Sequence, residues 1–227
     1  MNVNFDLPKL DLVIFDLDGT LIDSETDLIN SVNATRHWLG MPPLDAQIVA
    51  SYVGNGAPVL IRRAIGPEPS EADLQRALDY FLAYYREHML DHTRLYPGVD
   101  EALNILRDGG LHLAILTNKP VRFSQLIIEG LGLASHFFRI YGGNSFPERK
   151  KPDPVGIDTL RQEANVSREA TVMVGDSAVD VKTARNAGVM SAGVLFGFQP
   201  KSFEQDPPDL LINHMNLFAA DVVKAKG

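Results

Sequence analysis

Two carboxylates stand two residues apart in the segment Asp16-Leu17-Asp18-Gly19-Thr20. In an extended chain, residues at this spacing project to the same side, so both side chains can face one cavity. Carboxylates gathered in one pocket repel each other unless a cation or a proton lies between them. A hard divalent ion such as Mg²⁺ binds one or two carboxylates together with waters and substrate phosphate oxygens. Because Asp-x-Asp-Gly also occurs in calcium loops and ordinary turns, this segment alone leaves the chemistry open.

Two more groups of polar residues, Thr117-Asn118 and Asp176, each follow a short apolar run. In an open parallel sheet, ligands bind at the carboxyl ends of the strands, where the strand order reverses. If the three runs are neighbouring strands, Asp16, Asp18 and Asp176 bring about three negative charges to one crevice, which requires a cation before a phosphate can approach. Local structure offers another interpretation, because Thr117-Asn118 and Asp180 are also residues that begin helices.

Short apolar runs alternate with helix-like segments along most of the chain. The runs predict strands at residues 12–15, 111–116, 138–141, 171–174, 192–196 and 210–212. The segments between them predict helices at residues 99–107, 123–131, 154–164, 178–187 and 217–224. Near-continuous apolar strands flanked by helices are typical of a sheet buried on both faces. The sequence therefore predicts an α/β fold, a doubly wound and mostly parallel sheet with a Rossmann-like core.

The stretch from about residue 25 to residue 95 breaks this alternation. It contains no convincing strand and at least three segments with apolar residues at helical spacing. We therefore predict an α/β core formed by residues 1–23 and 96–227 and an inserted helical cap formed by residues 24–95. Tyr96-Pro97-Gly98 would be the return hinge.

Composition excludes several classes of protein. The 227 residues carry a formal net charge of −8, which disfavours nonspecific binding to nucleic acid or to an anionic membrane surface. There is no cysteine, which excludes disulfides and thiolate metal sites. No apolar run approaches the roughly 20 residues that span a bilayer. We expect a cytoplasmic protein with no nucleic-acid or membrane partner.

Four segments together resemble the haloacid-dehalogenase-like (HAD) hydrolases. The segment Asp16–Ser24 (DLDGTLIDS) matches the opening signature of that superfamily, and Thr117-Asn118 resembles its second motif. Lys151 before Pro152 resembles the third motif, and Gly175–Asp180 (GDSAVD) the fourth. They occur in the family's order, and the family carries a small helical cap between its first two motifs. The resemblance thus implies the same insertion that the periodicity predicts.

The resemblance implies roles for the acidic residues. Asp16 would attack phosphorus and become an aspartyl-phosphate, while Asp18 would act as general acid and then general base. Asp16, the backbone carbonyl of Asp18, and Asp176 would hold Mg²⁺. Asp180 would support the metal through a neighbouring ligand.

The resemblance also implies residues that bind the phosphoryl group. Thr117 and Asn118 would donate hydrogen bonds to its oxygens, and Lys151 would offset negative charge on it and on the nucleophile. Without the motif, Lys150 and Lys151 read as a solvated pair on a loop. The adjacent Pro152 and the family pattern select Lys151.

Substrate choice is expected to come from the cap. The segment Tyr52–Pro58 (YVGNGAP) resembles the corresponding stretch of bacterial phosphoglycolate phosphatases. Backbone N–H groups at Asn55 and Gly56, leading into a helix, would bind a small carboxylate, and Arg62 or Arg63 would add positive charge. The alternative is an ordinary helix-breaking turn with both arginines in solvent.

These inferences predict a Mg²⁺-dependent phosphatase that converts 2-phosphoglycolate to glycolate and phosphate through an aspartyl-phosphate. Its partner would be a small phosphorylated carboxylic acid, and the chain would be a monomer or a homodimer. A phosphatase for another small phosphomonoester, or a sugar phosphomutase of the same superfamily, are alternatives. A non-catalytic sensor of phosphorylated ligands is an alternative from another class.

Overall fold

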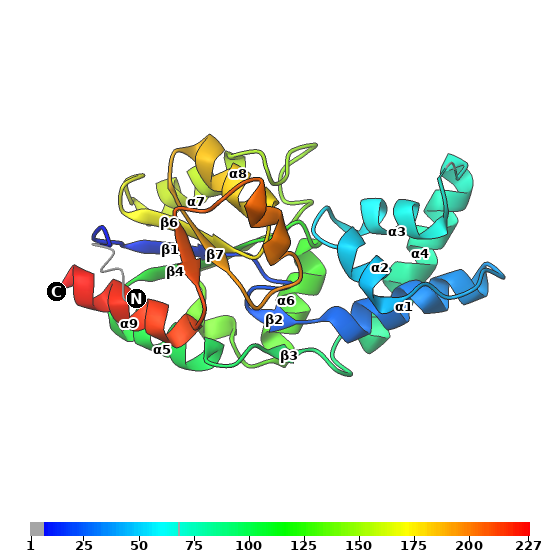
Figure 1. Cartoon of the computed structure of the whole chain (residues 1–227), viewed down its shortest axis with the longest axis horizontal. Coiled ribbons are helices and arrows are strands. Elements are labelled where there is room, and N and C mark those ends of the chain that lie inside the picture. The colour runs from blue at the N-terminus through cyan, green and yellow to red at the C-terminus, as the bar shows by residue number, and fades with distance from the viewer. Residues whose placement is uncertain (1–6, 68) are drawn as a thin grey trace.

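The centre of the structure is a six-stranded sheet in the order β5–β4–β1–β6–β7–β8, in which every neighbouring pair is parallel (Figure 1). This computed structural model describes residues 7–67 and 69–227; the first six residues of the predicted core and Glu68 of the predicted cap lie outside them. The strands are β1 (Leu12–Phe15), β4 (His112–Leu116), β5 (Arg139–Tyr141), β6 (Thr171–Gly175), β7 (Met190–Val194) and β8 (Leu210–Ile212).

Strand β1 is apolar at every position because both of its faces are buried. Leu12 and Ile14 pack on one side of the sheet, while Val13 and Phe15 pack on the other, and all four are fully buried. Burying each such side chain stabilises the fold by about 1.5–3 kcal/mol. Helices therefore cover both faces, as a parallel sheet requires.

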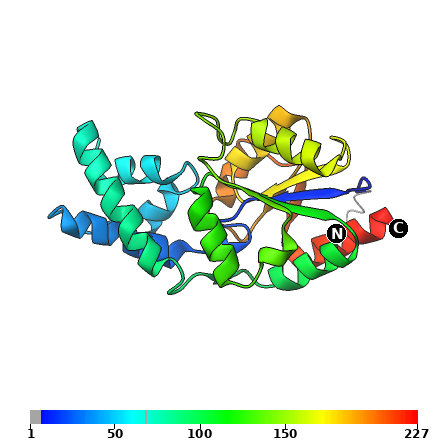
Figure 2. The same ribbon diagram turned by 180° about the vertical axis from the view of Figure 1, so that it is seen from behind.

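One layer of helices contains α5, α6 and α9, and the other contains α7 and α8 (Figures 1 and 2). The helices of the core are α5 (Val99–Asp108), α6 (Val121–Gly130), α7 (Val155–Ala164), α8 (Ala178–Ala187) and α9 (Met215–Lys226). Two short 3₁₀ helices follow α6 and β7, η1 (Ala134–His136) and η2 (Pro200–Glu204). Helix α8 ends as predicted at Gly188, whose φ of 66° places it in the left-handed region that glycine adopts readily.

The insertion consists of four helices, which we call the cap. They are α1 (Glu25–Trp38), α2 (Ala46–Tyr52), α3 (Ala57–Ile65) and α4 (Glu71–His88). In Figure 1 the cap lies at one end of the molecule, beyond the carboxyl ends of the core strands. The division of the whole chain at residues 24–95 stays a prediction.

A two-stranded antiparallel sheet joins the core to the cap, and it corrects the expectation that residues 25–95 contain no strand. Its strands are β2 (Ile22–Asp23) and β3 (Arg94–Leu95). Two residues are too few to show an alternating pattern, so periodicity could not find this pair. The predicted strand at residues 192–196 is also shifted, because β7 ends at Val194.

The two chain crossings are tied together by Asp27, a buried carboxylate in the first turn of α1. It accepts hydrogen bonds from the backbone N–H of His92 and of Thr93, and from the Thr93 hydroxyl, at 2.8–3.1 Å. The His92 ring nitrogen Nδ1 also lies 2.9 Å from it. Although burial opposes ionisation, these hydrogen bonds lower the pKa of Asp27. The start of α1 and the return segment before β3 are thereby held side by side.

The predicted fold class is confirmed, a parallel α/β sheet with a helical insertion after its first strand. Within residues 7–67 and 69–227, none of the helices combines the length and apolar character needed to cross a bilayer.

Candidate active site

The sheet order brings the predicted site residues together. β1 lies between β4 and β6, so Asp16, Thr117 and Asp176 leave three adjacent strands at the same edge. The chain runs from β1 to β4 on one side and later adds β6 on the other. This is the reversal of strand order at which ligands bind in open α/β sheets.

Three buried carboxylates form the acidic centre of this site. Oxygens of Asp16, Asp176 and Asp180 all lie within 4.8 Å of one another. The ammonium group of Lys151 lies 2.9 Å from Asp16 and 2.6 Å from Asp180. Three carboxylates and one lysine leave two unbalanced negative charges, which equals the charge of one divalent cation.

The pKa values of Asp16 and Asp176 are raised, mainly because both carboxylates are buried. Burial raises the pKa of Asp16 to about 6, against the attraction of Lys151 and with the help of Asp180. Burial also raises the pKa of Asp176 well above its usual value, and Asp180 and Asp16 add to the shift. Lys151 keeps its proton, because Asp16 and Asp180 raise its pKa despite burial.

Glycines leave room for these carboxylates. A Cβ at Gly19 would lie 2.2 Å from Oδ2 of Asp176, and one at Gly197 would lie 2.3 Å from Cβ of Asp176. A Cβ at Gly175 would lie 2.1 Å from the carboxyl carbon of Asp180. An all-oxygen ligand set with two excess negative charges fits Mg²⁺.

Asp180 has two functions at once. One of its oxygens accepts hydrogen bonds from the backbone N–H and hydroxyl of Ser177, which caps α8, and the other binds Lys151. The helix-start and metal-site interpretations of Asp180 are therefore compatible. One oxygen of Asp180 lies within the cluster, and its predicted role in supporting the metal through a neighbouring ligand stays a prediction.

The Asp18 carboxylate has partners outside this cluster. It is bound by the ammonium group of Lys119, at 2.9 and 3.0 Å, and by the hydroxyl of Ser24 at 2.6 Å. The side chain of Asp18 is therefore not one of the clustered carboxylates, and the predicted contact with the metal through its backbone stays a prediction. Lys119 was missed as a site residue, although it directly follows Thr117-Asn118.

Thr117 and Asn118 are buried at the end of β4. The Thr117 hydroxyl accepts a hydrogen bond from the backbone N–H of Lys119. The side-chain amide of Asn118 donates to the carbonyls of Gly54 in the cap and Lys151 in the core, and its buried oxygen Oδ1 has no partner. Asn118 thus connects the cap, the second motif and the third motif.

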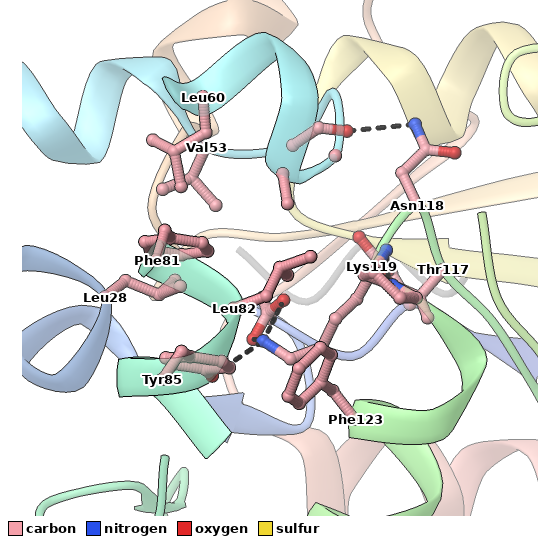
Figure 3. A pocket seen from close by; sticks show the side chains of 16 residues that line it. Leu28, Val53, Leu60, Phe81, Leu82, Tyr85, Thr117, Asn118, Lys119 and Phe123 are labelled. Carbon is pink, nitrogen blue, oxygen red and sulfur yellow. Dashed lines mark hydrogen bonds and ion pairs between the residues drawn. The ribbon is translucent and has the colours of Figure 1, made fainter. Parts of the chain in front are cut away.

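A small cavity separates the core from the cap (Figure 3). Its volume is about 50 Å³, room for a few water molecules. The core contributes Asp16, Asp18, Thr117, Asn118, Lys119, Pro120 and Phe123 to its lining. The cap contributes Leu28, Val53, Gly54, Gly56, Ala57, Leu60, Phe81, Leu82 and Tyr85.

The structure does not bring all the predicted cap residues to this cavity. Gly56 lines it, but Asn55 does not, and the Asn55 carbonyl accepts a hydrogen bond from Lys150. Arg62 corrects our expectation, because it is exposed and pairs with Glu71 at 2.8 Å. The buried face of α3 has the spacing 57, 60, 61 and 64, which places positions 62 and 63 on the solvent side.

Comparison with known proteins identifies the family. The model of the haloacid dehalogenase-like hydrolases matches residues 13–194, most of the chain and all four motifs. The chain belongs to this family. The haloacid dehalogenase-like hydrolases it resembles include curated proteins named phosphoglycolate phosphatase. The one from Chromobacterium violaceum is 44% identical over 86% of this chain and 90% of its own length. The one from Pseudomonas putida is 39% identical over 92% of this chain and 78% of its own length.

A solved structure has the same architecture as this chain. The crystal structure of a predicted phosphoglycolate phosphatase from Haemophilus somnus superposes with a TM-score of 0.88. It is 31% identical in sequence and covers 93% of this chain and 97% of its own.

Proposed function

We propose that this hydrolase is a Mg²⁺-dependent phosphatase that converts 2-phosphoglycolate to glycolate and phosphate. The observation that carries this proposal is the position of Asp16, which belongs to the carboxylate cluster and also lines the cavity. A metal ion in the cluster and a phosphoryl group in the cavity would therefore meet at one side chain.

Two observations support the substrate. The curated relatives named phosphoglycolate phosphatase are 38–44% identical to this chain over most of its length. A sugar phosphomutase would need contacts for a second phosphate, and the described cap residues that line the cavity include no charged side chain.

Asp16 and Asp18 would divide the covalent chemistry. An oxygen of Asp16 attacks phosphorus, the bond between phosphorus and the glycolate oxygen breaks, and that oxygen takes a proton from the carboxyl group of Asp18. A water molecule then attacks phosphorus, gives a proton to Asp18, and releases phosphate and the Asp16 carboxylate. Asp18 is regenerated as an acid, and no other reactant is consumed.

The remaining residues would stabilise charge. Asp16 and Asp176 would hold Mg²⁺ with the backbone carbonyl of Asp18, and the metal would supply positive charge to the phosphoryl oxygens. Lys151 holds Asp16 in place at 2.9 Å and offsets its charge when phosphate approaches. Thr117, through its hydroxyl, would donate to a phosphoryl oxygen at the end of β4.

The test is phosphate release from a panel of phosphomonoesters by the purified protein, with Mg²⁺ and with a chelator. We expect Mg²⁺-dependent release with the highest kcat/KM for 2-phosphoglycolate. A sugar phosphate preferred over 2-phosphoglycolate would refute the substrate. Binding of phosphorylated ligands with no release from any of them would refute the reaction and favour a sensor.

A further inference from the structure

The carboxylate of 2-phosphoglycolate needs a cationic partner inside a mostly apolar cavity. An unpaired carboxylate that loses its water there is strongly destabilised. Tyr85 supplies the one polar side chain that the described cap residues contribute to the lining. Among the described lining residues, Lys119 is the one cation. Arg62 and Arg63 are on the opposite face of their helix, so the predicted arginine contact is not available.

Lys119 already binds a carboxylate in this structure. Its ammonium group contacts both oxygens of Asp18, at 2.9 and 3.0 Å, and the hydroxyl of Tyr85 at 2.8 Å (Figure 3). It also lies 4.6 Å from the centre of the Tyr85 ring. The side chain of Lys119 is 5% exposed and that of Asp18 is 12% exposed. Lys119 and Ser24 thus form a carboxylate-binding site whose present occupant is Asp18, and the Tyr85 hydroxyl accepts a hydrogen bond from the same ammonium group.

The occupant is also the residue proposed to act as acid and base. While Lys119 and Ser24 hold the Asp18 carboxylate, both of its oxygens are bonded to them, and it is not part of the carboxylate cluster that contains Asp16. Acid–base catalysis requires Asp18 to exchange these bonds for one to the glycolate oxygen. Something must replace it on Lys119, because a buried ammonium group left unpaired is strongly unfavourable.

We propose that Lys119 and the Tyr85 hydroxyl bind the carboxylate of the substrate, which displaces Asp18 and frees it for acid–base catalysis. This inference rests on the proposed function. The exchange replaces one carboxylate with another, so the buried lysine stays paired throughout. A phosphomonoester without a carboxylate would leave Asp18 on Lys119 and would lose kcat as well as affinity.

The experiment compares 2-phosphoglycolate with ethyl phosphate, which carries a methyl group in place of the carboxylate. The variants are Lys119→Met, Lys119→Arg and Tyr85→Phe. We expect Lys119→Met to lower kcat/KM for 2-phosphoglycolate about 10- to 100-fold more than for ethyl phosphate, the range for a buried charged hydrogen bond. Lys119→Arg keeps the charge and should recover part of the preference. Tyr85→Phe should raise KM for 2-phosphoglycolate a few-fold more than for ethyl phosphate.

Lys150→Met is the matched control. Lys150 is the neighbouring lysine that bonds the Asn55 carbonyl but does not line the cavity. Its loss should change kcat/KM for both substrates by the same factor. If Lys150→Met lowered kcat/KM for 2-phosphoglycolate more than for ethyl phosphate, the assignment of the carboxylate to Lys119 would be contradicted.

The outcomes separate this inference from the proposed function. One outcome is that the wild type releases phosphate from 2-phosphoglycolate while Lys119→Met and Tyr85→Phe lower kcat/KM equally for both substrates. In that case the carboxylate site is refuted and the phosphatase activity stands. If the wild type releases phosphate from neither, both are refuted. If Lys119→Met does not fold, Tyr85→Phe decides, because that change removes one hydroxyl only.

Discussion

Asp16 shows how one residue type obtains its function from its surroundings. It shares Lys151 with Asp180, its pKa is raised by burial, and it borders the cavity. Asp209, another carboxylate, only joins β7 to the segment before β8, through hydrogen bonds with Ser191. The function of a carboxylate therefore depends on its position, and Asp16 lies at a strand end where the strand order reverses.

The substitution Asp16→Asn should abolish turnover without unfolding the chain. The amide has nearly the shape of the carboxylate but is a poor nucleophile, so we expect kcat to fall by about 10³-fold or more. Phosphate release from 2-phosphoglycolate measures the loss of turnover, and a thermal unfolding curve shows whether the variant is still folded. Asp221→Asn, an exposed carboxylate on α9, is the control and should keep full activity. Near-normal turnover by Asp16→Asn would contradict a role as nucleophile.

Site residues at strand ends could be predicted, and those that depend on side-chain direction could not. Asp16, Thr117 and Asp176 follow apolar runs, so the fold class alone brings them together. Lys119 points into the cavity because Asp18 and Tyr85 hold it there, which no local pattern encodes. Arg62 was predicted from charge alone, although the apolar spacing of its helix already indicated the solvent side.

At the scale of elements, three core side chains hold one loop of the cap. Gln199 donates to the carbonyl of Val53, Asn118 to Gly54 and Lys150 to Asn55, at 2.7–2.9 Å. The three carbonyls are consecutive, between α2 and α3. This loop is therefore the part of the cap that closes the cavity over the second and third motifs.

Gln199→Ala should weaken closure of the cap. Each such hydrogen bond contributes about 0.5–1.5 kcal/mol, so we expect KM for 2-phosphoglycolate to rise about 2- to 10-fold. Steady-state kinetics provide the measurement. Gln75→Ala changes a glutamine on the exposed face of α4, which bonds Asp79, and should leave KM unaltered. If the two variants behave alike, the loop does not depend on this contact.

Asp27 should stabilise the two chain crossings between the core and the cap. Asp27→Ala leaves the partly buried N–H group of His92 and the buried N–H group of Thr93 without an acceptor, and we expect the free energy of unfolding to fall by about 3 kcal/mol. Urea unfolding measures this change. Asp91→Ala removes a half-exposed carboxylate that pairs with His88 at the surface and should cost about 1 kcal/mol or less. Equal losses in the two variants would rule out a special role for Asp27.

The long helices and strands could be predicted because their buried faces produce a regular pattern of apolar residues in the sequence. β1 is apolar at all four positions since both its faces are covered, and α8 ends at a glycine in the left-handed region. The β2–β3 pair could not be predicted, since each strand has two residues and their partner lies about seventy positions away.

At the scale of the whole molecule, the acidic cluster links stability to pH and to metal. The folded protein without metal binds protons at Asp16 and Asp176 more tightly than the unfolded chain, because both pKa values are raised. The contribution of Asp16 to stability is therefore complete below about pH 4 and is lost as the pH rises through about 6, and the contribution of Asp176 is likewise lost as the pH rises through its own raised pKa. Mg²⁺ binds the deprotonated carboxylates, so its affinity should change in the opposite direction.

Mg²⁺ should therefore raise Tm more at about pH 7.5 than at about pH 5. At a hundred times its Kd, the ion should add about 3 kcal/mol at the higher pH. Thermal unfolding at both values, with Mg²⁺ and with chelator, checks this expectation. Asp176→Asn should lose most of the response and Asp221→Asn should keep it. A response that is larger at the lower pH would show that the cluster does not bind the ion.

The most direct test of the account is to look for the phosphoryl group on Asp16. The protein is mixed with 2-phosphoglycolate and Mg²⁺, quenched with acid within one turnover, and digested for mass spectrometry. We predict one phosphoryl group on the peptide that contains Asp16, and none in the Asp16→Asn variant. Release of phosphate with no phosphorylated peptide, or with the group on another residue, would contradict the account.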